Sequence, residues 1–254
     1  MTNPHFWYTL FMVKVMKNCN NEFEDYYYQY LDYNGNENIV CSRNRESKVN
    51  IFYYPIIISF YKNKIIYSIS SNYYGELKEC MNNRTFKNRY EIISFFKNFF
   101  EKKNEKISIQ EMKRMIKTKE SNIDIYRVVR IDEKYKKEYF NSFEKHSELE
   151  YKEKKWNIVN KYMYVSGIVK DEKIVSSGFV SNIDYNGANI VIQTKEKYRK
   201  NGYGKAVVEK ISRDLLKENR IPIYWVNIEN KASIQLASSL DFEELATELV
   251  VRII

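Results

Sequence analysis

The chain has 254 residues, of which 44% are hydrophobic and 30% charged, and its formal net charge is +9. This length and this apolar fraction are typical of one large or two small globular domains, and they exclude a disordered chain. The lysines are spread along the chain among many glutamates, as in EKKNEKISIQEMKRMIKTKE. Such scattered charge is typical of a solvated surface and argues against a nucleic-acid partner.

Cysteines and histidines are few. The three cysteines, Cys19, Cys41 and Cys80, have no Cys-x-x-Cys spacing, so they favour a reducing compartment over a disulfide framework. Two histidines, His5 and His146, offer too little for a histidine metal site or a serine–histidine triad. No metal is therefore expected.

Two apolar runs, FWYTLFMV and IFYYPIIISFY, are too short to span a bilayer. No basic segment precedes the first of them, so no signal peptide is expected. The sequence therefore predicts a cytoplasmic protein without a membrane partner.

Residues 1–121 are predicted to form a smaller N-terminal α/β domain of unknown role. Within it, IIISFYKNKIIYSISS predicts a hairpin and YEIISFFKNFFEKK an amphipathic helix. The aromatic run EDYYYQYLDY is more typical of packing or of an interface than of a platform for stacking bases. KTKESN is the expected joint to the second half.

The first hairpin resembles a later one. SFYKNKIIYSISSNYYG and GIVKDEKIVSSGFVSNIDYNG share a strand, a lysine-rich turn, a second strand, and then Tyr and Gly. One interpretation is a decayed internal duplication, and the other is chance similarity of short strands. If the first half is a copy, it lacks the glycine-rich basic loop of the second.

Residues 122–254 show a regular alternation of strands and helices. The expected strands are IDIYRVVRI, YMYVSGIVK, KIVSSGFVS, GANIVIQT, IPIYWVNI and ELATELVVRII. The expected helices are EKYKKEYFNSF, SELEYKEKKWNIVNKY, the helix bearing Val207, Val208, Ile211 and Leu215, and KASIQLASSL. A tight turn at Asp171-Glu172 joins the second and third strands. The order β-α-α-β-β-β-α-β-α-β predicts an α/β (α+β) fold, a mixed sheet with helices on both faces.

A basic loop with two of the chain's seven glycines, Gly202 and Gly204, lies between a predicted strand and a predicted helix. The first N–H groups of a helix have no intrahelical partner, and glycines allow an anion to approach them closely. Arg199, Lys200 and Lys205 add positive charge. The pattern favours a phosphate site over a solvated turn, although the P-loop and dinucleotide fingerprints are both absent.

Three motifs resemble those of the GNAT superfamily of N-acetyltransferases. YRKNGYGKA resembles its acetyl-CoA signature [QR]-x-x-G-x-[GA], with Arg199, Gly202 and Gly204 on the defining positions. TKEKYR resembles V-x-P-x-Y-R, with Thr194 at the valine position. VNIENKASIQLASSLDF resembles V-N-x-x-N-x-x-[AS]-x-x-L-Y-x-x-x-G-F, with matches at Val226, Asn227, Asn230, Ser233, Leu236 and Phe242. The resemblance covers about residues 122–254.

The resemblance implies a GNAT-like sheet and an acyl-CoA-dependent N-acyltransferase, which transfers acetyl from acetyl-CoA to a primary amine of a small molecule or peptide by direct attack on the thioester. It places the pyrophosphate on the N–H groups of residues 199–205 and the pantetheine along residues 192–194. Catalysis would rest on positioning and on a backbone oxyanion donor. The implied cofactor-binding residues are Ile192, Gln193, Thr194, Arg199, Lys200, Asn201, Gly202, Tyr203, Gly204, Lys205, Asn227, Asn230 and Ser233.

The sequence departs from the family pattern at the expected catalytic positions. The usual tyrosine acid falls on Ala237, and the strand that often carries a glutamate offers Asn189 and Gln193. Ser233 and Ser238 are poor acids. No catalytic residue is assigned, and a non-catalytic GNAT-derived coenzyme A sensor or scaffold is the alternative function.

The acceptor side is less well defined. Trp225 could line a substrate cleft or belong to the core, and Glu148 and Glu150 could attract a cationic amine or form a solvated helix face. The helix with Ile92, Phe96, Phe99 and Phe100 would expose a large apolar face if it were left in solvent. The first half is therefore expected either to shape the acceptor side or to form a homodimer, and a degenerate GNAT-like half is one interpretation of its fold.

Overall fold

The computed structural model describes residues 22–46, 53–125, 127–143 and 149–254. Residues 22–31 form an N-terminal helix. The helices and strands that follow are β1 (Ile39–Cys41), η1 (Arg43–Arg45), β2 (Ile56–Tyr61), β3 (Lys64–Ile69), α2 (Ser71–Met81), α3 (Arg89–Lys102), β4 (Ile107–Ile116), β5 (Val129–Arg130), η2 (Glu133–Tyr135), α4 (Lys136–Phe143), α5 (Leu149–Asn160), β6 (Val165–Lys170), β7 (Lys173–Asp184), β8 (Gly187–Thr194), η3 (Glu196–Tyr198), α6 (Tyr203–Lys217), β9 (Ile221–Asn227), α7 (Lys231–Ser238) and β10 (Glu243–Ile253). His5, Cys19, His146, Glu148 and the run FWYTLFMV lie outside the described residues.

Within the described residues, ten strands form one mixed sheet in the order β1-β3-β2-β10-β4-β9-β8-β7-β6-β5. The predicted α/β fold with a mixed sheet and flanking helices is confirmed. The predicted hairpin of the first half is β2 and β3, and the helix after it is α3. The meander of the second half is β6, β7 and β8, with positive φ angles at Asp171 and Glu172 in its first turn.

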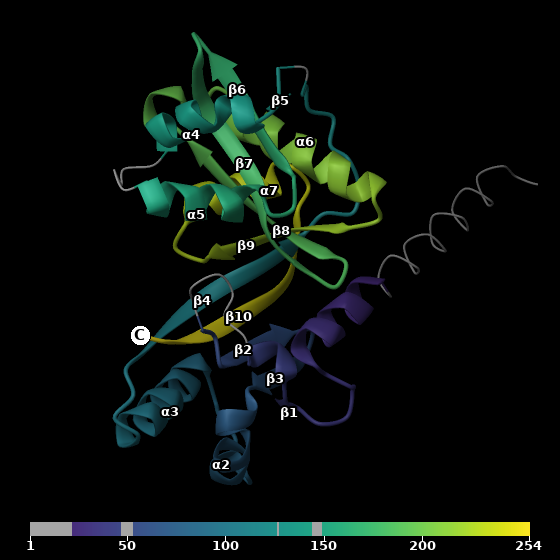
Figure 1. Cartoon of the computed structure of the whole chain (residues 1–254). Coiled ribbons are helices and arrows are strands. Elements are labelled where there is room, and N and C mark those ends of the chain that lie inside the picture. The colour runs from purple at the N-terminus through teal and green to yellow at the C-terminus, as the bar shows by residue number, and fades with distance from the viewer. Residues whose placement is uncertain (1–21, 47–52, 126, 144–148) are drawn as a thin grey trace, which may run out of the picture.

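The two halves of the chain share this sheet because β4 lies between β9 and β10. β4 belongs to the first half, yet it pairs antiparallel with β9 on one side and with β10 on the other. Figure 1 shows β4 and β10 as long strands that run from the part with α6 and α7 to the part with α2 and α3. The sheet therefore continues through the expected boundary near residue 121.

Helices cover both faces of the sheet. On one face, α6 and α7 bury Val207, Ile211 and Ala237 against β7, β8 and β9, and α3 packs against β2 and β10. On the other face, α4 and α5 cover β6 and β7, and helix 22–31 covers β9 and β10. In helix 22–31, Tyr26 and Tyr27 are fully buried, so the aromatic run there is packing. No helix in the described part of the chain is long and apolar enough to cross a bilayer.

The expected joint, residues 117–122, is pinned to the second half by its two buried residues, Lys117 and Ser121. Lys117 is fully buried, forms an ion pair with Glu209 of α6, and donates hydrogen bonds to Ser121 and to the Leu240 carbonyl. The N–H of Ser121 donates to Glu209 Oε1 at 2.8 Å. The segment therefore fixes the end of β4 against α6 rather than acting as a free linker.

One sequence prediction differs from the structure. The strand expected over residues 123–131 is reduced to β5, because the Ser121 and Ile123 carbonyls accept hydrogen bonds from the Arg213 side chain and the Val128 N–H closes a turn. After the first hairpin the chain enters α2, whereas the second hairpin continues into β8. The second meander thus has no complete counterpart in the first half.

Candidate functional site

A gap in the sheet opens between the C-terminal ends of β8 and β9. These parallel strands pair at three positions, Gly187 with Ile221, Ala188 with Pro222 and Asn189 with Ile223, and the pairing stops there. Both strands keep their outer neighbours, because β8 pairs with β7 as far as Thr194 and β9 pairs with β4 as far as Asn227. The two parts of the sheet therefore diverge at this point.

The strand ladders decide which backbone groups point into the gap. The Lys195 N–H donates to the Val175 carbonyl on β7. Because alternate residues of a strand point their N–H and C=O groups to opposite sides, Val191 and Gln193 also face β7. Ile192 and Thr194 then direct their backbone groups away from β7 and into the gap, whereas Gln193 does not.

The basic loop lies at the end of β8 and leads into α6. Gly202 is the N-cap of α6 with φ +76°, a left-handed conformation that favours glycine. The first intrahelical bond runs from the Ala206 N–H to the Gly202 carbonyl. The N–H groups of Tyr203, Gly204 and Lys205 precede this bond, so they lie at the positive end of the helix dipole.

The second glycine marks a close approach between three elements. A Cβ added to Gly204 would lie 3.1 Å from Leu236 Cδ1 of α7 and 3.3 Å from Thr194 Oγ1 of β8. An added Cβ on Gly202 would meet nothing within 4 Å. Gly204 thus allows α6 to start close against β8 and α7, while Gly202 leaves open space in front of the helix.

Charged and apolar side chains surround this helix start. Arg199 is exposed and its Nε donates to the Thr194 carbonyl at 3.3 Å, which ties the loop to the end of β8. Lys200 is also exposed and has φ +63°. Half-buried apolar residues also pack against the hydrophobic core beneath α6 and α7. They include Ile192, Tyr198, Tyr203, Ile234 and Leu236. A phosphate and a thin apolar chain would both find matching surfaces here.

The predicted asparagines have local structural roles at the end of β9 and the start of α7. Asn227 Oδ1 accepts the Glu229 N–H at 2.8 Å, and Asn230 caps α7 by accepting the Ser233 N–H at 3.1 Å. Burial raises the pKa of Tyr224 on β9, and a hydrogen bond with the Ser233 side chain opposes this shift. Ala237 is fully buried. The end of β8, the start of α6 and α7 therefore lie close together, while Asn227, Asn230 and Ser233 are engaged in local contacts.

A buried charged cluster on the opposite face of the sheet was not found from sequence. Glu248 of β10 is fully buried and accepts hydrogen bonds from Arg114 Nε at 2.7 Å, Tyr27 Oη at 2.8 Å and Trp225 Nε1 at 2.9 Å. Trp225 itself is half-buried, and the Tyr54 ring meets it edge-on with centroids 5.8 Å apart. Trp225 is thus held by the core and also contacts the first half on the side away from α6.

Glu150 lies on a solvated helix face. Its carboxylate forms an ion pair with Lys154 one helical turn later, and the pair is 80% and 73% exposed. The hydrogen bond from Lys154 lowers the pKa of Glu150. The solvated-face interpretation therefore holds for this residue.

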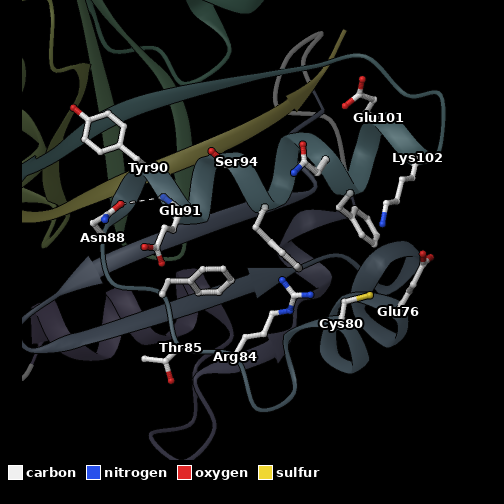
Figure 2. Close-up of a pocket in the computed structure, with 14 residues that line it drawn as sticks. Glu76, Cys80, Arg84, Thr85, Asn88, Tyr90, Glu91, Ser94, Glu101 and Lys102 are labelled. Carbon is white, nitrogen blue, oxygen red and sulfur yellow. Dashed lines mark hydrogen bonds between the residues drawn. The ribbon is translucent and has the colours of Figure 1, made fainter.

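A hollow also lies elsewhere, between α2 and α3 of the first half. It measures about 1060 Å³ and is lined by carboxylates and cations alike, among them Glu76, Arg84, Glu91 and Lys102 (Figure 2). It contains none of the residues that surround the gap. Among the side chains that the structure describes, no group of three metal-ligating residues gathers at a point.

The comparisons with known proteins agree with this geometry. A family model for the GNAT acetyltransferase matches residues 44–247, about four-fifths of the chain. The chain belongs to the GNAT acetyltransferase family. The match begins well before the expected boundary at residue 121, so the family similarity extends into the first half.

Solved structures show the GNAT fold at low sequence identity. An acetyltransferase of the GNAT family from Colwellia psychrerythraea has a TM-score of 0.51 and 11% identity, over 78% of this chain and 84% of its own. A GCN5-related N-acetyltransferase-like protein from Streptococcus suis has a TM-score of 0.47 and 13% identity, over 78% of this chain and 83% of its own. A GNAT protein from Novosphingobium aromaticivorans has a TM-score of 0.45 and 15% identity, and 66% of its length is covered by 58% of this chain. No curated protein sequence matches the chain.

Proposed function

We propose that this protein is an acyl-CoA-dependent N-acyltransferase that transfers acetyl from acetyl-CoA to a primary amine of a small molecule or peptide. The observation that carries the proposal is the gap between β8 and β9, with the Gly202 start of α6 at its mouth. Membership of the GNAT family supports acyl transfer as the reaction class. The nature of the acceptor amine is part of the proposal.

The residues present fit acetyl-CoA in two places. The N–H groups of Tyr203, Gly204 and Lys205 and the open space at Gly202 suit a pyrophosphate, and Arg199 and Lys200 add positive charge. The inward backbone groups of residues 192 and 194 suit the amide groups of a pantetheine arm, as in strand addition. Bound acetyl-CoA supplies the activated acyl group.

This chain would act mainly by orientation. A backbone N–H that points into the gap can stabilise negative charge on a reacting carbonyl oxygen, and holding the amine beside it removes the entropy cost of the encounter. Tyr54 of the first half and Trp225 lie together on the face away from α6. We assign this aromatic pair to the acceptor side, which gives the first half a role in limiting access of the amine.

A non-catalytic acyl-CoA sensor is the second candidate function. The observation that favours it is the buried Ala237 at the position where the family carries its tyrosine acid. Turnover distinguishes the two: an enzyme releases free coenzyme A thiol across a panel of primary amines at pH 8–9, where amines are deprotonated. Tight binding of acetyl-CoA without thiol release from any amine would favour the sensor.

Binding itself is tested by thermal unfolding with acetyl-CoA. At a ligand concentration of one hundred times Kd, stabilisation is about 2.7 kcal/mol, which raises Tm by roughly 5–11 °C for a chain of this size. Gly202→Asn should remove this shift, because asparagine tolerates positive φ while its side chain fills the space in front of the helix.

Gly35→Asn is the matched control. Gly35 also has positive φ, +91°, and open space around it, but it lies in the first half. This variant should keep the full acetyl-CoA shift. If the unmodified chain shows no shift at millimolar acetyl-CoA, the proposed function is wrong.

A further inference from the structure

The side chain of Asn189 occupies the point where β8 and β9 separate. Its Oδ1 accepts the backbone N–H of Trp225 at 3.1 Å, so a side-chain oxygen of β8 takes a donor that belongs to the backbone of β9. The last paired residues of the two strands are Asn189 itself and Ile223. The gap therefore begins at this side chain.

The register identifies the contact that Asn189 replaces. The Ile221 N–H donates to the Asn186 carbonyl at 2.8 Å. In a parallel ladder donors and acceptors advance by two residues on each strand, so two steps further on the Trp225 N–H would bond to the Ile190 carbonyl. It bonds instead to Oδ1 of Asn189, which lies a side-chain length away from the backbone of β8. The contact that a continued ladder would form here is thus replaced by a longer one from the side chain.

A bulge in β7 holds the Asn189 amide in this orientation. Ser181 is the extra residue of β7, since the pairing with β8 shifts between Val180 and Asn182. Asn189 Nδ2 donates to Ser181 Oγ at 2.9 Å, and Ser181 Oγ donates to the Asn189 carbonyl at 3.3 Å. With the amide nitrogen fixed on Ser181, the amide oxygen can only point toward β9.

We propose that Asn189 is a positioning residue that keeps β8 and β9 apart and so leaves the gap open for the acyl-CoA arm. This inference rests on the proposed function for the occupant of the gap, but the separation of the strands can be tested without a ligand. Without the side-chain acceptor, the Trp225 N–H pairs with the Ile190 carbonyl and the Ile192 N–H with the Trp225 carbonyl. The arm of acetyl-CoA then has to break this new pairing before it can bind.

The first experiment measures amide hydrogen exchange in the ligand-free protein. In Asn189→Ala, the Ile192 N–H should exchange roughly tenfold more slowly than in the unmodified chain, because it gains a strand partner. Asn189→Asp should behave like the unmodified chain, since a carboxylate oxygen still accepts the Trp225 N–H and Ser181 can donate to the other oxygen. Unchanged exchange at Ile192 in the alanine variant would overturn the inference.

The second experiment measures acetyl-CoA binding and ligand-free Tm. Asn189→Ala should raise Kd by roughly two- to tenfold, the range that one net hydrogen bond represents, with Tm unchanged or higher. Asn182→Ala is the control, because Asn182 also lies half-buried on this face but accepts only a long bond from Tyr162, at 3.4 Å. Its Kd should not change.

The outcomes separate the two proposals. If the unmodified chain does not bind acetyl-CoA, the proposed function fails and the exchange of the Ile192 amide alone decides the role of Asn189. If the unmodified chain binds and Asn189→Ala binds equally well, the inference fails and the function stands. A fall in ligand-free Tm for Asn189→Ala, with Asn189→Asp stable, would show a merely structural residue and would also overturn it.

Discussion

Removing the Glu248 carboxylate should destabilise the protein more than any exposed charge does. Glu248 is fully buried and its partner Arg114 is 4% exposed. Burial alone would lower the pKa of Arg114, but the Glu248 carboxylate raises it well above its ordinary value, so the guanidinium is charged. In Glu248→Leu this charge stays in the core without its counterion, the Trp225 N–H loses its acceptor, and the Tyr27 hydroxyl keeps only Ser59.

The expected loss in the free energy of unfolding is about 3–5 kcal/mol, the usual cost of breaking a buried ion pair by removing one partner. For a chain of this length it corresponds to a Tm lower by roughly 6–20 °C. The assay is thermal and urea unfolding at pH 7, followed by tryptophan fluorescence and circular dichroism. The exposed pair provides the control: Glu150→Leu should leave the free energy of unfolding nearly unchanged, because an exposed ion pair contributes little.

A double variant tests the physical reason for this loss. Glu248→Leu with Arg114→Met removes both charges, so it should recover part of the stability that the single variant loses. The reasoning is refuted if Glu248→Leu costs less than about 1 kcal/mol, or if the double variant is as unstable as the sum of both single variants. The first result would mean that water enters the cluster and solvates Arg114.

Three further predictions concern the joint, the acid response and the first half. Lys117→Met should lower the unfolding free energy by about 1.5–3 kcal/mol in urea titration, the usual contribution of a hydrogen bond to a charged group, since buried Glu209 loses one of its two cationic partners and keeps Arg213; a loss below about 1 kcal/mol would contradict this. The hydrogen bond from Tyr28 lowers the pKa of Glu24 below 4.5, so this carboxylate stabilises the fold above that pH, and the contribution disappears as pH falls through the lowered pKa. The difference in stability between the unmodified chain and Glu24→Gln should accordingly shrink between pH 6 and 3, and a constant difference would refute the linkage. A chain of residues 122–254 alone should be insoluble or unfolded by circular dichroism, because it lacks β4, and a folded monomer would show that the sheet closes without it.

Local periodicity was enough to find most elements of the second half. In α6 the apolar stripe through Val207, Val208, Ile211 and Leu215 matches its buried face. The glycine-rich loop was also recognisable, because Gly202 and Gly204 are required by a left-handed turn and by a close approach. Both features depend on residues that are near one another in the chain.

Strand β4 could not be recognised in the same way. Its sequence, ISIQEMKRMI, carries charged residues that are typical of a solvated segment. In the structure, the three charged residues of β4 each form an ion pair with a residue outside the strand. Glu111 pairs with Arg89, Lys113 with Glu244 and Arg114 with Glu248. The last two pairs join residues more than 130 positions apart. Sequence periodicity indicates which face of an element is buried, but not which strand lies beside it.

The position of β4 explains why the first half matters for the gap. β9 pairs with β8 at only three positions, because an open gap requires these strands to separate. On its other side β9 pairs with β4 at five positions, from Ile223 to Asn227. This stretch of β9 is the part that borders the gap, and its regular strand pairing comes from the first half of the chain. The first half therefore fixes the position of β9 beside the gap, and Asn189 determines where β8 separates from β9.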